Sequence, residues 1–186
     1  MSLAQTHAKM SFEEFLDWSA RQADGNYELV DGEIVEMPSE GGLHNLVKAA
    51  LMIALRDAAK RARFAGTVFT DGMTVRIDDE HGRVPDASVT ATPVADKSAT
   101  TLFDPYIVAE VVSPTSLRDD TGSKLNEYFK VPTIQHYLIV RPDKKLIVHH
   151  SRGDAGKWIT SIVTEASLRL DPPGLVLDLA PVFEAC

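Results

Sequence analysis

The sequence has only one cysteine, Cys186, which excludes an intrachain disulfide. It has no apolar run of the length that crosses a bilayer, and its first residues, MSLAQTHAKM, lack the apolar core of a signal peptide. Internal repeats and low-complexity segments are also absent. With 186 residues, of which 44% are hydrophobic, we expect a single cytoplasmic domain over residues 1–186, with no membrane segment.

Basic residues are scarce in this chain. It has 19 Lys and Arg against 27 Asp and Glu, which gives a net charge of −8. This balance disfavours a broad nucleic-acid surface, because phosphate binding depends on Lys and Arg. An enzyme whose acidic pocket holds metal ions is compatible with it, since the bound cations change the local field.

The N-terminal region predicts a short helix followed by a hairpin. Ser11 and Glu14 have the spacing of a capping box, so we expect a helix to begin directly after Ser11. The segment YELVDGEIVEM, residues 27–37, predicts a hairpin in which Asp31 and Gly32 form the two-residue turn.

Residues 43–63 give the clearest helical pattern, with apolar residues recurring at helical spacing. Most of the basic residues of this helix, Lys48 among them, lie off the apolar stripe. His44 falls in line with Leu51 and Leu55, so we expect it to point toward the core from the first turn.

The rest of the chain predicts mainly strands. The segments are GTVFTDGMTVRI (66–77, one interrupted strand or two short ones), RVPDASVT (83–90), YIVAEVV (106–112), IQHYLIV (134–140), KLIVHH (145–150) and WITSIVTE (158–165). A helix over about 118–130, halted by Pro132, separates the third and fourth of them. The resulting order is helix, three strands, helix, strand, with an N-terminal hairpin and C-terminal strands. It predicts an α/β (α+β) fold with a mixed central sheet flanked by helices.

Two carboxylates stand out within these strands. Glu110 interrupts an otherwise apolar run, and a buried carboxylate needs a partner, a metal or a proton. Asp86, which we place within the preceding central strand, can meet it at the same end of the sheet. Two carboxylates there suit Mg²⁺ or Mn²⁺, and the backbone carbonyl of Val112 can add a ligand.

Six segments give the chain a family resemblance through their order and spacing. They are YELVDGEIVEMP, HNLVKAALMIAL, VPDASV, AEVVSPTS, KLNEYFKV and IQHYLIV. The chain resembles the PD-(D/E)XK nuclease superfamily and, more closely, the Uma-two-type family of restriction endonucleases. The resemblance covers most of the chain and implies a restriction endonuclease-like core of helix, three strands, helix and strand.

The resemblance also implies a set of site residues. Pro85 and Asp86 match the first element of the motif, and Glu110 matches its central acidic residue. The motif lysine would stand at position 112, where this chain has Val112. In some relatives that lysine moves to the following helix, and Lys124 is the candidate here.

The function implied by the resemblance is Mg- or Mn-dependent hydrolysis of DNA phosphodiester bonds, with Asp86, Glu110 and Lys124 as catalytic residues. Because many nucleases of this kind act in pairs, we expect a homodimer. The alternative is a catalytically silent protein of the same fold that serves as a binding or assembly subunit. The acidic balance and Val112 favour this alternative, whereas the set of Asp86, Glu110 and Lys124 favours the enzyme.

Each acidic or basic residue of the set also has a structural interpretation. Glu110 can form a salt bridge with an arginine or lie at an edge, and Asp86 can merely end a strand. Lys124 can be a surface lysine at the border of its helix's core stripe. Tyr128 lies one turn after Lys124 on the same face.

Three further residues remain open. His44 is either a hydrogen-bonded core histidine or a site residue, and the resemblance leads us to expect a histidine at this place. Glu28 is either an outer acidic member of the pocket or an exposed strand residue. Ser113, in the SPTS loop, is a candidate neighbour of the site. We interpret His136, His149 and His150 as strand residues, since their spacing is not that of metal ligands.

Overall fold

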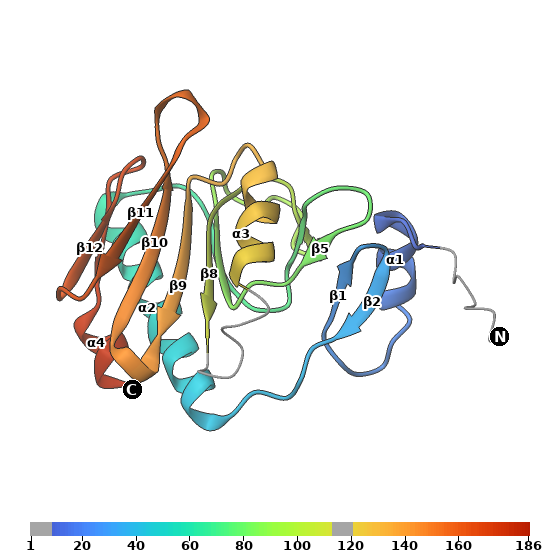
Figure 1. Ribbon diagram of the computed structural model, residues 1–186, viewed down its shortest axis with the longest axis horizontal. Helices are drawn as coiled ribbons and strands as arrows, with labels where there is room; N and C mark the ends of the chain where they lie inside the picture. Colours follow the sequence, from blue (N-terminus) through green and yellow to red (C-terminus); the bar gives the residue numbers. More distant parts are fainter. Residues whose placement is uncertain (1–8, 113–120) are drawn as a thin grey trace.

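The structure, a computed structural model, describes residues 9–112 and 121–186 (Figure 1). Its α-helices in these ranges are α1 (Phe12–Ser19), α2 (Gly42–Ala62), α3 (Thr121–Lys130) and α4 (Ala180–Glu184). Two short 3₁₀ turns cover Pro142–Lys144 and Asp154–Gly156. None of the helices within these ranges is long and apolar enough to cross a membrane.

The central element is a six-stranded mixed sheet with the order β11-β10-β9-β8-β6-β3. Its strands are β3 (Val68–Thr70), β6 (Ala87–Thr90), β8 (Pro105–Val111), β9 (His136–Arg141), β10 (Leu146–Arg152) and β11 (Trp158–Val163). Strands β8 and β9 are parallel, and the other neighbours are antiparallel. The order α2, β3, β6, β8, α3, β9 is the predicted core of helix, three strands, helix and strand.

The two long helices cover opposite faces of this sheet. Ile107 and Ala109 of β8 pack in one buried cluster with residues of α2. The alternate residue Val108 packs in a second cluster with Tyr128 of α3. This alternation follows from the strand period of two residues, and it assigns Glu110 to the face that α3 covers.

A smaller five-stranded sheet has the order β2-β1-β5-β4-β7. Its strands are β1 (Tyr27–Val30), β2 (Glu33–Glu36), β4 (Thr74–Arg76), β5 (Gly82–Arg83) and β7 (Thr101–Leu102). A separate hairpin, β12 (Ser167–Leu170) and β13 (Leu175–Asp178), packs near α2. In Figure 1 the β1–β2 hairpin and α1 lie at the right, and β10 to β12 lie at the left.

The local predictions for the N-terminal region are confirmed. Ser11 and Glu14 form the capping box at the start of α1, with each side chain bonded to the other's backbone amide. Asp31 and Gly32 form the turn between β1 and β2, and both have a positive φ (52° and 75°). A positive φ at both central residues is the geometry of a type I′ turn, which matches the twist of a hairpin.

Two predicted strands divide between the two sheets. The segment 66–77 forms two short strands, β3 in the larger sheet and β4 in the smaller one, separated at Asp71 and Gly72. The segment 83–90 was predicted as one returning strand, and this was wrong. It contributes β5 to the smaller sheet and β6 to the larger one, with a break at Pro85, which has no N–H for a ladder hydrogen bond.

The placement of Asp86 within a strand was also wrong, because β6 begins one residue later. Helix α3 is described from Thr121, so its predicted start near residue 118 lies outside the described residues. The later strands agree with prediction, since β10 and β11 form the expected antiparallel pair around residues 153–156.

The packing of α2 on the sheet gives a stability test. We expect Leu51→Ala to lower the free energy of unfolding by about 2–5 kcal/mol, because Leu51 is fully buried and its truncation leaves a cavity. Leu46 lies on the same helix but is 63% exposed, so Leu46→Ala should change the free energy of unfolding by less than about 0.5 kcal/mol. Urea unfolding measures both, and equal effects would contradict this packing.

Candidate active site

A cavity of about 400 Å³ opens at the end of the larger sheet where β6 begins and β8 ends. One part of its wall is apolar, with Met37, Leu43 and Val111 among its residues. The other part carries the residues that the sequence singled out, together with one that it did not: His44, Asp86, Glu110, Val112, Lys124 and Glu40.

Asp86 is held at the end of the larger sheet by a hydrogen bond from the backbone of β8. Its side chain is about 95% buried, and the Val111 N–H donates to Oδ2 at 2.6 Å. The carboxylate thereby accepts a hydrogen bond from a backbone N–H of β8, at the position just before β6 begins. Its other oxygen, Oδ1, lies 3.2 Å from His44 Nε2.

Glu110 is buried on the α3 face of β8, with 6% of its surface exposed. The Tyr128 hydroxyl donates to Oε1 at 2.8 Å, and Lys124 Nζ lies 3.2 Å from the same oxygen. Burial raises the pKa of Glu110 to about 7, with smaller contributions from the charges of Asp86 and Glu28, and the nearby Lys124 ammonium opposes the rise. Glu110 is therefore an acid that titrates near neutral pH.

Asp86 directly precedes β6, and Glu110 lies on β8, the antiparallel neighbour of β6. Ala87 is paired with Ala109, so the same register carried one residue further sets Asp86 opposite Glu110. Both side chains line the same cavity, and the charge of Asp86 raises the pKa of Glu110. Burial is a larger cause of this rise than the charge of Asp86. That the two carboxylates share one ion stays a prediction.

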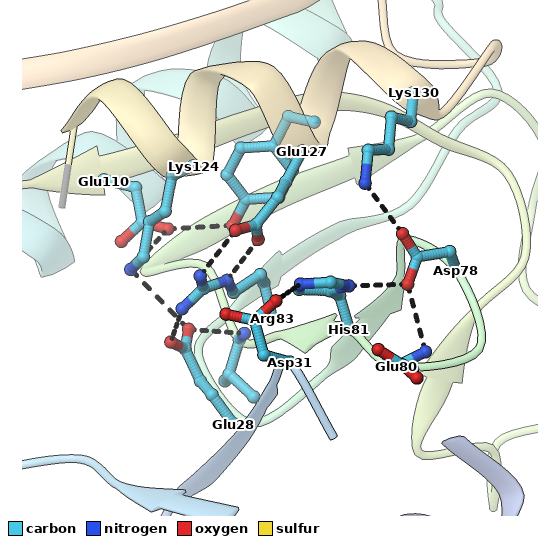
Figure 2. A network of polar contacts seen from close by, with 12 residues as sticks. Glu28, Asp31, Asp78, Glu80, His81, Arg83, Glu110, Lys124, Glu127 and Lys130 are labelled. Carbon is cyan, nitrogen blue, oxygen red and sulfur yellow. Dashed lines mark hydrogen bonds and ion pairs between the residues drawn. The ribbon is translucent and has the colours of Figure 1, made fainter. Parts of the chain in front are cut away.

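Lys124 points from α3 into the site and is only 4% exposed. Besides Glu110, its ammonium lies 3.6 Å from Glu28 Oε1. The alternative interpretation of Lys124 as a surface lysine was wrong, because acidic and basic side chains of β1 and β5 lie against this edge of its helix (Figure 2). Val112 packs beside Tyr128 on the face that carries Glu110, as the alternation predicts.

Glu28 is likewise buried, with 4% of its surface exposed. Its Oε2 accepts a hydrogen bond from Arg83 Nη1 at 2.7 Å, and its Oε1 accepts one from the Val84 N–H at 3.1 Å. Arg83 also binds both carboxylate oxygens of Glu127, at 2.6 and 2.8 Å. Figure 2 shows these contacts as one chain of alternating charge that ends at Glu110.

A second group of charges gathers on the α2 side of Asp86. Ligand atoms of Glu40, His44 and Asp86 lie within 4.8 Å of one another. The hydrogen bond to Asp86 raises the pKa of His44, against a smaller opposing effect of burial. Glu110 is not part of this compact group.

Lys48 lies inside the same group, although sequence reasoning placed it off the apolar stripe. It is 4% exposed, and its Nζ contacts Glu40, lies 2.9 Å from Asp71 and lies 3.9 Å from Asp86. Burial lowers its pKa, but the hydrogen bonds to Glu40 and Asp71 outweigh this and the pKa is raised. The signal was available, since Lys48 is one turn after His44 on the same helix face.

Arg83 and Glu127 also belong to the surroundings of the site, but no local signal in the sequence marks them. They are 44 positions apart, and nothing local pairs them. Ser113 lies outside the described residues, so its nearness to the site stays a prediction. The ligand role of the Val112 carbonyl also stays a prediction.

The histidines of β9 and β10 lie away from this site, as strand residues. His136 Nδ1 lies 2.8 Å from His149 Nε2, and His136 Nε2 lies 2.7 Å from the Pro172 carbonyl oxygen. His150 lies 2.8 Å from the Thr160 hydroxyl across the β10–β11 pair.

The model of the Uma2 family, described as "Putative restriction endonuclease", matches residues 12–180. The chain belongs to the Uma2 family. A protein of Synechocystis sp. (strain ATCC 27184 / PCC 6803 / Kazusa), named only as uncharacterized, is 28% identical over 173 residues, which cover 92% of this chain and 89% of that protein.

A solved structure shares the fold of this Uma2 member. It is a crystal structure from Anabaena variabilis ATCC 29413 described as "a putative nuclease belonging to DUF820". The TM-score is 0.73 at 17% sequence identity, and the match covers 95% of this chain and 98% of the other. At this identity the likeness shows the fold.

The donor set of the cavity fits a divalent cation. The carboxylates that line it, Glu40, Asp86, Glu110 and Asp143, outnumber the one lysine that lines it, Lys124. A divalent cation offsets such an excess. Carboxylate oxygens suit Mg²⁺ or Mn²⁺.

The raised pKa of Glu110 makes stability depend on pH in a defined direction. The folded protein, with its pKa of about 7, holds a proton that the unfolded chain releases at its ordinary value of 4.5. The stabilisation by that proton is present below pH 4.5 and is lost as the pH rises through 7. It amounts to about 3 kcal/mol, since a tenfold change in proton affinity corresponds to about 1.4 kcal/mol.

We therefore expect the metal-free protein to lose stability between pH 5 and 8 relative to Glu110→Gln, which has no carboxylic proton to lose. Urea unfolding in the presence of a chelator measures the difference in unfolding free energy between the two proteins. The contributions of titrating groups common to both cancel in this difference. Glu165→Gln, at an exposed position, should follow the wild type. Parallel pH profiles for wild type and Glu110→Gln would show that the Glu110 pKa is unshifted.

Proposed function

We propose that this protein is a metal-dependent endonuclease that hydrolyses DNA phosphodiester bonds, with Asp86, Glu110 and Lys124 as its catalytic residues and Mg²⁺ or Mn²⁺ as its cofactor. The observation that carries the proposal is the position of the Lys124 ammonium, 3.2 Å from Glu110 in a cavity that Asp86 also lines. A lysine delivered from α3 thus stands beside the acid, although the motif position itself is Val112.

Each residue has a role that follows from its surroundings. Asp86 and Glu110 would hold the cation, and Tyr128 orients Glu110 through its hydroxyl. His44 and Glu40 are accessory ligands or hydrogen-bond partners on the Asp86 side. A bound Mg²⁺ or Mn²⁺ supplies Lewis-acid activation of the phosphodiester and a more acidic water. Lys124 is the group that would stabilise the negative charge developing on the phosphoryl oxygens.

The protonation of Glu110 should set the pH range of the reaction. A carboxylate ligand must be ionised, and the pKa of Glu110 is about 7 in the metal-free protein. Metal binding should therefore release a proton at pH 6 and become tighter toward pH 8. When the bound cation neutralises the Glu110 carboxylate, the Lys124 ammonium beside it stays available to pair with the phosphate.

Cleavage of DNA by substituted proteins tests the catalytic set. Incubation of varied DNA substrates with Mn²⁺ should give strand cleavage by the wild type. Lys124→Ala should lower the rate roughly 100-fold or more, as the loss of one transition-state donor does elsewhere, while Mn²⁺ still binds. Asp86→Asn should weaken both Mn²⁺ binding and cleavage.

Lys130→Ala is the matched control, because Lys130 lies on the same helix but is about half exposed and paired with Asp78. It should cleave like the wild type. Calorimetric titration with Mn²⁺ separates metal binding from catalysis. Full cleavage by Lys124→Ala would exclude the proposed lysine. Mn²⁺ binding without cleavage by the wild type on any DNA would instead favour a catalytically silent binding subunit.

The proposal includes a homodimer, for which β11 offers a surface. This strand is at the edge of the larger sheet, its sequence WITSIV has no charge, and Ile159 and Ile162 are 59% and 67% exposed. An uncharged exposed edge strand is a template for pairing with another strand. Antiparallel pairing of two copies about Thr160 and Ser161 would set Ile159 opposite the partner subunit's Ile162.

Light scattering tests this pairing. The wild type should have the mass of a dimer, and Ile162→Lys should have the mass of a monomer because the charge would face the partner strand. Val176→Lys, at an exposed apolar residue of β13, should remain dimeric. A wild-type monomer at the working concentration, or a dimer that tolerates Ile162→Lys, would remove the β11 interface.

A further inference from the structure

Arg83 lies between Glu28 and Glu127 in the buried chain of alternating charge shown in Figure 2. Only 5% of its side chain is exposed, and its guanidinium divides between two carboxylates. Nε and Nη2 bind the two oxygens of Glu127, and Nη1 binds Oε2 of Glu28. This fork holds three elements together: β5, which carries Arg83, α3 and β1.

Glu28 connects this fork to the proposed catalytic lysine. Its Oε2 is taken by Arg83, while its Oε1 accepts the Val84 N–H and lies 3.6 Å from Lys124 Nζ. With one oxygen fixed by Arg83, the carboxylate can turn only a little. The Lys124 ammonium thus lies between two fixed acids, Glu28 and Glu110.

A purely structural role explains this chain poorly. Burying charges is costly, and a buried ion pair is often no more stabilising than an apolar pair of similar size. An apolar contact between β5 and α3 would therefore join the smaller sheet to this helix as well. What an apolar contact cannot do is fix the place of an ammonium on a long, flexible side chain.

We propose that Arg83 is a positioning residue for Lys124, acting through Glu28, an inference that rests on the nuclease function proposed above. Arg83 holds Glu28, and Glu28 holds the Lys124 ammonium at the mouth of the cavity beside Glu110. Arg83 itself forms its hydrogen bonds with Glu28 and Glu127, and not with the proposed ligands Asp86 and Glu110. Its loss should misplace the lysine and leave Asp86 and Glu110 where they are.

The expected effect of Arg83→Gln is selective. The turnover number should fall roughly 100-fold, as small misplacements of a catalytic group can cause, with KM and Mn²⁺ affinity close to the wild type. Glu28→Gln, which keeps the shape but removes the charge facing Lys124, should do the same. Arg76→Gln is the matched control, since Arg76 lies on the neighbouring β4 and pairs with Glu13 and Asp79 at the surface.

A second readout does not need activity. Reductive methylation followed by mass spectrometry measures how accessible each lysine amine is, and Lys124 and Lys48 are both only 4% exposed. In Arg83→Gln and Glu28→Gln, Lys124 should react roughly tenfold faster than in the wild type because its local opening becomes easier. Lys48, which pairs with Glu40 and Asp71 on the other side of the sheet, should react at the wild-type rate and serves as the control within each molecule.

The two readouts separate the possible failures. Unchanged methylation of Lys124 in both variants would overturn the positioning role, whether or not the protein cleaves DNA. Equal acceleration at Lys48 and Lys124 would show general loosening and would also overturn it. If Arg83→Gln does not fold, Glu28→Gln decides by the same criteria. If the wild type cleaves no DNA while Lys124 alone becomes accessible, the positioning of Lys124 stands and the nuclease function fails.

Discussion

The burial of the Glu110 carboxylate is the constraint on which the rest of the site depends. A charged group in an apolar strand costs several kcal/mol unless neighbouring groups compensate it. The Tyr128 hydroxyl and the Lys124 ammonium supply that compensation only in part, since the pKa of Glu110 is still raised. The Lys124 ammonium is itself buried, and Glu28 lies 3.6 Å from it as a second compensating charge.

The same requirement explains why the smaller sheet packs where it does. Glu28 comes from β1 and Arg83 from β5, and both strands belong to that sheet. The five-stranded sheet therefore supplies part of the electrostatic environment of a cavity formed mainly by the six-stranded one. Its contribution to the site is charge placement, whereas the α2 side contributes His44, Lys48 and Glu40.

The sequence predicted the elements whose signals are local. The capping box, the Asp31-Gly32 turn, the periodicity of α2 and the order of the core follow from residue patterns over a few positions. The division into two sheets could not be predicted in this way. Strands β5 and β7 have two residues each, which is too short to show any periodicity, and the pairings of β5 with β1 and of β7 with β4 join strands that are distant in the sequence.

The site was predictable to the same extent. The alternation of β8 and the antiparallel neighbour relation bring Asp86 and Glu110 to one end of the sheet. The burial of Lys124 was harder to predict, because a helical pattern assigns polar residues to the solvent side unless a distant partner is known. The pairing of Arg83 with Glu127 depends wholly on tertiary contacts.

One backbone contact of Asp86 has a practical consequence. The Val111 amide donates to the Asp86 carboxylate at 2.6 Å, so the proton of this amide lies directly against the proposed ligand. Its chemical shift in nuclear magnetic resonance spectra should respond to any change in the charge borne by that carboxylate. The central sheet thus contains a spectroscopic reporter in its own backbone, one that follows the occupancy of the site without a substrate.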